Sequence, residues 1–381
     1  MMCGSEFMKI GILTSWMRLG WGVDLVLHQL ATRLVERGHR VRIFTGMTDG
    51  SFGDTAYEMV PVPVKPHKVF AIFEWNARRW IKYFNQRDED IFLIATQPFF
   101  YFPKFLKKPC VSMEFGIVDT RGFSWRKRAN FAYMRLTQYY IYHRYTARII
   151  SNSKYTCSLL PPFQRQKCIP IYHGYEHVLP PPGTDRAALR KQFREKFDIS
   201  DDDILLLYVG RINPRDQPYK GTAELMQSAV ELRGKFPQCR LMMAGIGSDY
   251  DVKLCREAGI IPVIEAPQDW MAGLYLAADI YCSASKWEGF NLPLLEAQSF
   301  GRPPVAYNIG AHPEVLNDCV TGFLVDSHDE FITRLGDLIS STDLRAEMGR
   351  RAAEWAEGFA WDSYTRGCER VLEEVIREAR R

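Results

Sequence analysis

Short apolar runs alternate with longer segments that are apolar on one helical face. Residues 9–13 and 40–45 are apolar runs, and residues 23–34 between them repeat apolar positions at helical spacing. Further short runs occur at 91–95, 110–113, 148–151 and 169–172. This alternation predicts parallel strands joined by helices, in a sheet that helices cover on both faces.

The pattern stops at Pro180-Pro181-Pro182-Gly183, a predicted linker, and then restarts. The second half predicts strands at 205–209, 240–244, 280–284 and 304–307, and helices at 221–234, 270–278 and 293–300. With 381 residues the chain fits two domains. We expect an N-terminal domain over 8–177, joined by a final helix at about 361–381, and a C-terminal domain over 178–360. The opening residues 1–7 read as a cloning scar.

The stretch from Glu288 to Glu296 is the best candidate for chemistry. Its two carboxylates lie eight positions apart, with Pro293 suited to a first helical turn between them. The amides of the residues at the helix start would be unpaired and would attract phosphates; these residues are Gly289, Phe290, Asn291 and Leu292. Such a layout suits a nucleotide-sugar, with one carboxylate near the sugar hydroxyls and the other near the ribose.

This stretch resembles the E-x7-E signature of retaining glycosyltransferases with the GT-B fold, family 4 (glycosyl transferases group 1). The flanks agree with that family at Gly301, Pro303, Gly310, Pro313-Glu314-Val315 and Thr321-Gly322. The resemblance implies an α/β chain with two doubly wound Rossmann-like domains facing a cleft. It also implies a C-terminal helix that crosses back to the first domain.

The segment Val209-Gly210-Arg211, followed by Lys220, resembles the family's diphosphate-binding loop. Two fixed cations would stabilise the charge that develops on a leaving nucleoside diphosphate, so no metal and no cofactor are expected. The resemblance therefore assigns Arg211 and Lys220 to catalysis, together with Glu288, which would position the sugar hydroxyls. It adds Gly22 and Gly245 to the donor-binding residues, along with Glu296, although a plain turn explains Gly245 equally well.

Glu114 stands where the family commonly has a histidine, after the strand that ends at Met113. Two interpretations of Glu114 stay open. It orients the acceptor or takes its proton, or it is a hydrogen-bonded structural carboxylate. Asp119 is a weaker alternative for the acceptor role.

Charge is distributed unevenly. Residues 8–175 hold 25 Lys/Arg against 11 Asp/Glu, whereas the rest of the chain from 176 holds 24 against 33. Aromatic residues crowd the basic stretch 121–148, which fits an anionic membrane surface or a lipid-linked acceptor. A helix with buried aromatic residues and a solvated basic face is the alternative. No recognition motif for nucleic acid is present, so nucleic acid is not an expected partner.

Nine scattered cysteines without a C-x-x-C pair predict a reduced protein without a structural metal. We expect a cytoplasmic location, with a peripheral position on the inner face of the cytoplasmic membrane. The expected function is transfer of a sugar from a nucleotide-diphosphate donor, a UDP-sugar being favoured, to a glycan or lipid-linked acceptor in polysaccharide or glycolipid biosynthesis. Two alternatives remain: a non-catalytic nucleotide- or sugar-binding scaffold, and a phosphorylase-like sugar-phosphate enzyme.

Overall fold

The computed structural model describes residues 7–381, and most of the expected cloning scar, residues 1–6, lies outside them. The described chain divides into two compact units. Unit 1 runs to Ile117 and adds Ser124–His173 and Trp361–Arg381; unit 2 contains Val118–Phe123 and Gly174–Ala360. Each unit is built around one parallel sheet.

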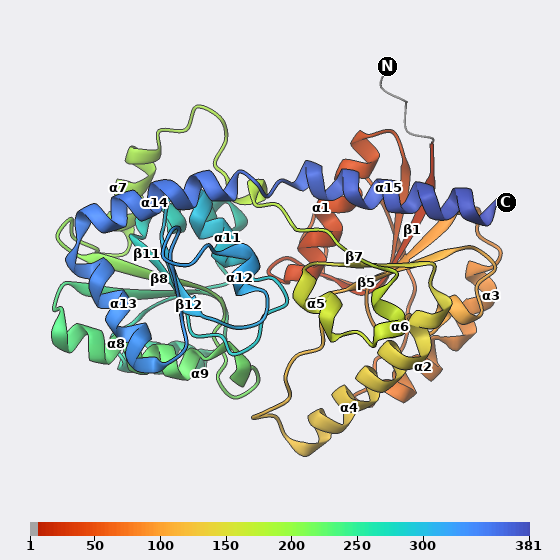
Figure 1. Ribbon diagram of the computed structural model, residues 1–381, viewed down its shortest axis with the longest axis horizontal. Coiled ribbons are helices and arrows are strands. Elements are labelled where there is room, and N and C mark those ends of the chain that lie inside the picture. The colour runs from red at the N-terminus through yellow and green to blue at the C-terminus, as the bar shows by residue number, and fades with distance from the viewer. Residues whose placement is uncertain (1–6) are drawn as a thin grey trace. The chain divides into compact units, whose positions relative to one another are not determined.

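The sheet of unit 1 has seven parallel strands in the order β3-β2-β1-β4-β5-β6-β7 (Figure 1). Their bounds are β1 Lys9–Met17, β2 Arg40–Thr48, β3 Glu58–Pro61, β4 Ile91–Ile94, β5 Cys110–Glu114, β6 Arg148–Ser151 and β7 Cys168–Pro170. Each of these strands except β3 overlaps an apolar run that the sequence predicts as a strand. The core between this sheet and its helices is rich in aromatic side chains, among them Phe44, Phe84 and Phe92.

Helices connect these strands and cover the sheet. They are α1 Gly22–Glu36, α2 Phe70–Ala77, η1 Arg78–Trp80, α3 Ile81–Phe84, η2 Phe102–Lys104, α4 Trp125–Arg135, η3 Leu136–Ile141, η4 Tyr142–Tyr145, α5 Lys154–Leu159 and α6 Pro162–Arg165. The α1 helix buries Val26, Leu27, Leu30 and Leu34 on one face, as its apolar spacing predicts.

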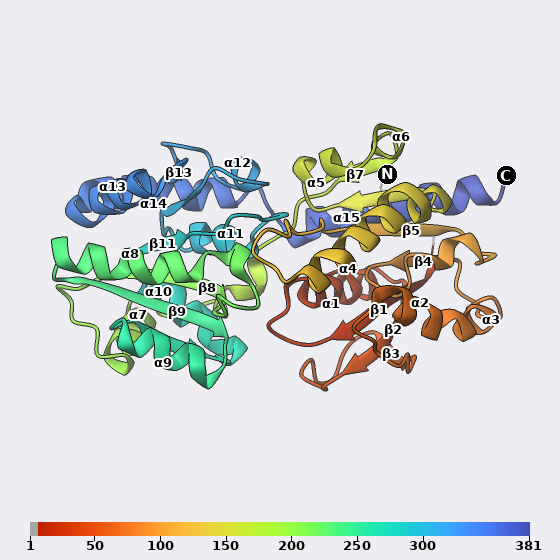
Figure 2. The ribbon, with the colours of Figure 1, turned by 90° about the horizontal axis from the view of Figure 1, so that it is seen from below.

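The last helix, α15 Trp361–Ala379, belongs to unit 1, and Figures 1 and 2 both show it along that unit's sheet. Glu369 of α15 accepts a hydrogen bond from Nε of Arg37 at 2.8 Å, and its other oxygen lies 2.7 Å from Nε2 of His39. The predicted return of the C-terminal helix to the first domain is therefore confirmed.

The sheet of unit 2 has six parallel strands in the order β10-β9-β8-β11-β12-β13. Their bounds are β8 Ile204–Arg211, β9 Cys239–Ile246, β10 Ile261–Ile264, β11 Ile280–Ser283, β12 Pro304–Tyr307 and β13 Phe323–Val325. The chain starts in the middle with β8, moves outward to β10, and returns with β11 on the other side of β8. The strand order thus reverses between β8 and β11, and ligands of such sheets bind at the carboxyl ends of the strands at this switch point.

The helices of unit 2 lie on both faces of this sheet. They are η5 Glu176–Val178, α7 Arg186–Lys196, η6 Pro218–Lys220, α8 Thr222–Lys235, α9 Asp249–Glu257, η7 Gln268–Trp270, α10 Met271–Ala277, α11 Leu292–Ser299, α12 His312–Val315, α13 His328–Ser340 and α14 Thr342–Ala356. Residues of α8, α9 and α13 pack into one hydrophobic core with the strands. Figure 1 shows α11 and α14 on the opposite face from α8 and α9. Two doubly wound units confirm the predicted fold class.

Candidate functional site

An ion pair lies at the switch point of unit 2. Lys220 ends the loop after β8, and Glu288 lies in the loop after β11. Nζ of Lys220 lies 2.8 Å from Oε1 of Glu288, and the hydroxyl of Ser285 donates to the same oxygen at 2.8 Å. Oε1 is therefore fixed by two donors. Within residues 7–381 no group donates to Oε2 of Glu288, so this oxygen is available to a ligand hydroxyl.

Two glycines allow the loops to approach so closely. Gly221 has a φ of +64°, and a Cβ there would lie 1.9 Å from the carbonyl oxygen of Ala284. Gly310 has a φ of +55°, and its Cβ would lie 2.2 Å from the carbonyl oxygen of Glu288. Both positions combine left-handed backbone with contact against another backbone, which only glycine accommodates without strain. The two glycines therefore allow the loops that carry Lys220 and Glu288 to pack closely together.

The ion pair keeps Lys220 charged. Burial alone would lower the pKa of Lys220, but the negative charge of Glu288 outweighs it, and the pKa of Lys220 is raised. The side chains are 20% and 9% exposed, so solvent screens this interaction only partly. The site thus presents a permanent cation beside an oriented carboxylate.

The start of α11 carries unpaired amides. Pro293 lies in its first turn, and Gly301, with a φ of +67°, follows its end, as the sequence predicts. In the described part of the chain, the N–H groups of Gly289, Asn291 and Leu292 donate to no other group. Phe290 is buried and packs against the ring of Phe359. The amides are the donors that an anionic ligand group would need.

Asn291 adopts a left-handed backbone, with a φ of 73°. Its Nδ2 lies 2.9 Å from Nε2 of His312, and Nδ1 of His312 lies 2.6 Å from the carbonyl oxygen of Tyr307. Since a carbonyl oxygen only accepts, Nδ1 of His312 carries the proton and Nε2 accepts from Asn291. Burial lowers the pKa of His312, which favours this neutral form. Sequence analysis missed His312, whose only signal is its place between Gly310 and Pro313.

Glu296 is buried within α11, and both of its oxygens have partners. The hydroxyl of Tyr275 donates to Oε2 at 2.5 Å, and Nε2 of His177 lies 3.1 Å from Oε1. Burial, followed by the charge of Glu296, raises the pKa of Tyr275, so this hydroxyl stays protonated and remains a donor. The structure therefore adds His177 and Tyr275 to the surroundings of Glu296, and its predicted ribose contact stays a prediction.

Arg211 and Gly245 lie at the carboxyl ends of β8 and β9. Arg211 is the last residue of β8 and is partly exposed, and the hydroxyl of Tyr208 donates to its carbonyl oxygen at 3.2 Å. Gly245 has a φ of +141°, and a Cβ there would lie 1.9 Å from the carbonyl oxygen of Gly210. The close approach of these two strands accounts for glycine at this position, and a donor contact remains a prediction.

Gly22 and Glu114 belong to unit 1. Gly22 is the first residue of α1, and a Cβ there would meet no described atom within 4 Å. Glu114 is 1% exposed. Its Oε1 accepts from the backbone N–H of Gly116 at 2.7 Å, and its Oε2 accepts from Nε2 of Gln138 at 2.7 Å and lies 3.1 Å from Nε2 of His143. This geometry favours the structural interpretation of Glu114.

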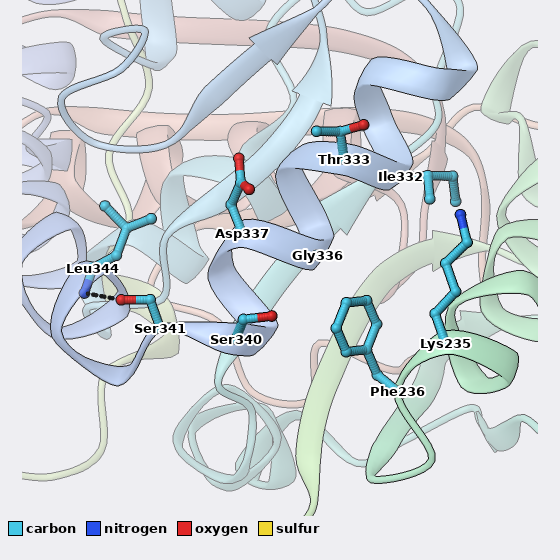
Figure 3. Close-up of a pocket in the computed structure, with 9 residues that line it drawn as sticks. All are labelled: Lys235, Phe236, Ile332, Thr333, Gly336, Asp337, Ser340, Ser341 and Leu344. Carbon is cyan, nitrogen blue, oxygen red and sulfur yellow. Dashed lines mark hydrogen bonds between the residues drawn. The ribbon is translucent and has the colours of Figure 1, made fainter.

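Residues 7–381 contain no group of three or more His, Cys, Asp or Glu side chains that could hold a metal ion. A cavity of about 520 Å³ lies near the carboxyl ends of α8 and α13, where Phe236 faces Gly336 (Figure 3). Because α8 ends where β9 is about to begin, this cavity lies at the amino ends of the strands. It is therefore separate from the loops that hold Lys220 and Glu288.

Solved structures define the class of fold. Sucrose-phosphate synthase from Thermosynechococcus elongatus aligns over 97% of this chain and 100% of its own, with a TM-score of 0.78 and 15% identity. HepE from Anabaena in complex with UDP-glucose aligns over 96% and 100%, with a TM-score of 0.78 and 17% identity. WaaG, a glycosyltransferase involved in lipopolysaccharide biosynthesis, aligns over 95% and 99%, with a TM-score of 0.76 and 17% identity. The fold is the GT-B fold.

Sequence comparison narrows the class to a family. Residues 190–355 match the model for glycosyl transferases group 1, and residues 22–177 match the model for glycosyltransferase family 4. D-inositol 3-phosphate glycosyltransferase from Corynebacterium kroppenstedtii is 32% identical over 212 residues, 52% of this chain and 46% of the relative. The enzyme of the same name from Kribbella flavida is 33% identical over 199 residues, 48% and 45% of the two chains. The chain spans about half the length of these curated relatives. It belongs to the GT-B glycosyltransferases of family 4.

Proposed function

We propose that this chain transfers a sugar, with retention at the anomeric carbon, from a nucleoside-diphosphate donor to a glycan or lipid-linked acceptor. The reaction would serve polysaccharide or glycolipid biosynthesis. The ion pair of Lys220 and Glu288 at the switch point of unit 2 carries the proposal, because it sets a fixed cation beside an oxygen free to accept a sugar hydroxyl. Relatives named D-inositol 3-phosphate glycosyltransferases support sugar transfer as the reaction.

A UDP-sugar is the favoured donor. HepE, which shares the fold, was solved with UDP-glucose and with UDP and glucose, and this supports the choice of base. In unit 2 the diphosphate would contact Lys220, Arg211 and the unpaired amides at the start of α11. Since these groups would supply the positive charge that the leaving diphosphate needs, we propose that no divalent metal takes part.

Retention would follow from attack on the face that the leaving group occupied. The bond between the anomeric carbon and the diphosphate oxygen breaks, and the acceptor oxygen bonds to the same face. The acceptor proton passes to the departing phosphate oxygen. In this scheme Lys220 and Arg211 stabilise the charge of the leaving group, and Glu288 orients the sugar through Oε2 and forms no bond to carbon. The stabilisation counts most in the transition state, where the charge develops.

We also propose a peripheral contact of residues 121–148 with an anionic membrane. The α4 helix in this stretch has no buried residue, and the side chain of Trp125 is 73% exposed. No residue of α4 is fully buried, but Phe131 of α4 packs against a buried cluster that includes Tyr139 of η3, so the alternative of a helix with aromatic core residues and a solvated basic face stays open. Within the described residues no helix is both long and apolar enough to span a bilayer.

A donor screen followed by a transfer assay tests the enzymatic proposal. Thermal unfolding of wild type and Lys220→Ala would be measured in the presence of UDP-, GDP- and ADP-sugars, without added metal. A ligand at 100 times its dissociation constant should stabilise the protein by about 2.7 kcal/mol. Transfer of the best donor's labelled sugar to a lipid extract would then be measured with and without EDTA, with Glu288→Ala as control. Donor binding without turnover would instead identify a non-catalytic scaffold, and a response to sugar phosphates alone would identify a phosphorylase-like enzyme.

A further inference from the structure

A second cavity lies wholly within unit 1, with a volume of about 870 Å³. Three separate segments line it: η1 and α3 with the two residues that follow α3, the stretch 101–107 around η2, and the junction of η3 and η4. Figure 1 shows α2, which leads into η1, and α4 as neighbours, and the ring contact of Phe70 with Phe131 joins them. The cavity is thus built by tertiary packing and does not belong to one flexible loop.

Five cationic side chains line this cavity, and no acidic residue is among the lining residues: Arg78, Arg79, Lys82, Lys104 and Lys107. In the described part of the chain none of the five makes an ion pair with a carboxylate. Like charges gathered around one hollow repel one another, and the repulsion falls when an anion enters. The cavity therefore has the electrostatics of an anion site.

The inner wall of the cavity contains two tyrosines whose hydroxyls are already used. The hydroxyl of Tyr101 donates to the carbonyl oxygen of Glu74 at 2.9 Å, and that of Tyr142 donates to Oε2 of the same residue at 2.8 Å. Glu74 is 5% exposed and does not line the cavity. With its tyrosine hydroxyls bonded to Glu74, the cavity depends on its cations to hold a ligand.

The rim of the cavity is apolar and exposed. Phe105 and Ile141 line it and are 49% and 42% exposed. Trp75, 68% exposed, lies under the guanidinium of Arg78 at 4.7 Å, and Nζ of Lys104 lies 5.6 Å from the ring centroids of Phe105 and Tyr145. Aromatic and aliphatic side chains interleaved with cations are typical of surfaces that enter the headgroup region of a bilayer. A small free anion bound in the cavity would leave these apolar side chains exposed to water.

We propose that this cavity is a binding site for the phosphate headgroup of an anionic phospholipid in a bilayer, with Phe105, Ile141 and Trp75 contacting the lipid around it. The proposal extends the membrane contact suggested above for residues 121–148 and rests on it. It differs in placing the lipid phosphate at Arg78, Lys82 and Lys104, none of which belongs to that stretch. The site is independent of the donor loops of unit 2.

The test is vesicle co-sedimentation with two charge-matched triple variants. One removes cavity charges, Arg78→Gln with Lys82→Gln and Lys104→Gln, and the other removes α4 charges, Arg126→Gln with Lys127→Gln and Arg128→Gln. Vesicles of phosphatidylcholine alone and with phosphatidylglycerol would be compared, after circular dichroism confirms that each variant is folded. Both variants lose three charges, so general attraction to the membrane falls equally. A headgroup site predicts about tenfold or greater loss for the cavity variant, and a clearly smaller loss for the α4 variant.

A neutral variant tests the rim. Phe105→Ser should weaken binding to phosphatidylglycerol vesicles about threefold or more without any change of charge. Equal losses of vesicle binding in the two triple variants would show that the protein is held by diffuse charge attraction and not by the cavity. The proposed membrane contact of residues 121–148 would then be unaffected. Absence of wild-type binding to anionic vesicles would overturn both. Binding of millimolar inorganic phosphate in solution that the cavity variant loses, while its binding to anionic vesicles stays at the wild-type level, would identify a free phosphate ligand and overturn the lipid assignment.

Discussion

Nζ of Lys220 lies 2.8 Å from Oε1 of Glu288, although 68 positions separate the two residues in the chain. The contact joins the loops that follow β8 and β11, the neighbouring strands between which the order of the sheet reverses. Without a ligand, the cation and the carboxylate thus hold each other in place. A donor would find both groups oriented, which reduces the reorganisation needed when charge develops.

Replacing Lys220 should affect both folding and turnover. Lys220→Ala leaves Glu288 with Ser285 as its remaining donor, and we expect the free energy of unfolding to fall by about 1–3 kcal/mol. Sugar transfer should fall by about 100-fold or more, because one of the cations for the leaving group is lost. Lys286→Ala is the matched control, since Lys286 is 44% exposed and pairs with Glu224. Denaturant unfolding and initial rates check both effects, and equal rates in the two variants would contradict the role of Lys220.

Glu288→Gln tests whether the side chain of Glu288 contacts the sugar of the donor or its phosphates. Its amide oxygen can still accept from Lys220 and Ser285, which places an N–H₂ group where Oε2 was. Binding of the free nucleoside diphosphate should therefore stay within about threefold, whereas kcat for transfer should fall by about 100-fold. Calorimetry and steady-state rates measure the two quantities. A variant that loses nucleotide affinity and keeps kcat would place Glu288 at the phosphates instead.

The sequence predicts strands well where apolar runs have clear ends. The predicted strands at 148–151 and 304–307 match β6 and β12 residue for residue. β13 has only three residues, and Pro262 inside the apolar run of β10 has no N–H to donate, which argues against a strand there. Both were missed because their stability comes from pairing with neighbours in the sheet, which local pattern does not contain.

The sequence predicts only those parts of the candidate site that local motifs specify. Glycines and prolines around Glu288 identify the loop and the helix start, because these residues have strong local conformational preferences. The bond from Asn291 to His312 joins residues 21 positions apart, and no periodicity signals it. Two side-chain partners of Glu114, Gln138 and His143, lie 24 and 29 positions further along the chain. Such contacts depend on tertiary packing, which the sequence pattern alone does not specify.

Glu114→Gln should reduce stability more than catalysis. The new amide would turn an N–H₂ group toward Nε2 of Gln138 or the N–H of Gly116, and leave a buried donor without an acceptor. We expect the free energy of unfolding to fall by about 1–3 kcal/mol. Well below the melting temperature, kcat should stay within about tenfold of wild type. Glu354→Gln, at a carboxylate on α14 that is 60% exposed, is the control for both measurements. A kcat loss of about 100-fold with an unchanged melting temperature would restore the acceptor role of Glu114.

The glycines at the two ends of α8, Gly221 and Gly234, should respond differently to replacement by alanine. Gly221 precedes α8 in a left-handed conformation, and a Cβ there would lie 1.9 Å from a backbone oxygen. Gly234 lies near the end of α8, where a Cβ would meet no described atom within 4 Å. Gly221→Ala should therefore destabilise the protein by at least about 1 kcal/mol and weaken donor binding, since it displaces the Lys220 loop. Gly234→Ala should be neutral or stabilise by up to about 1 kcal/mol. Thermal unfolding of the pair checks this, and equal melting temperatures would argue against a rigid Lys220 loop.

His312 should make both stability and donor binding depend on pH. Burial lowers its pKa in the folded protein below the unfolded value of about 6.5. Below that pH the unfolded chain binds more protons than the folded one, so stability falls as the pH decreases from about 6.5 through the lower folded pKa. Protonation also removes the acceptor at Nε2, which releases the side chain of Asn291.

The measurement is the free energy of unfolding between pH 7.5 and 5 for wild type and His312→Leu, together with the donor dissociation constant for each. The variant should be less stable at pH 7.5, because the Nδ2 group of Asn291 loses its partner. Its stability should fall less steeply with acid, since the titrating group is gone. Donor affinity should weaken with acid in wild type and should already be weak in the variant. Parallel pH profiles would show that His312 does not control the conformation of Asn291.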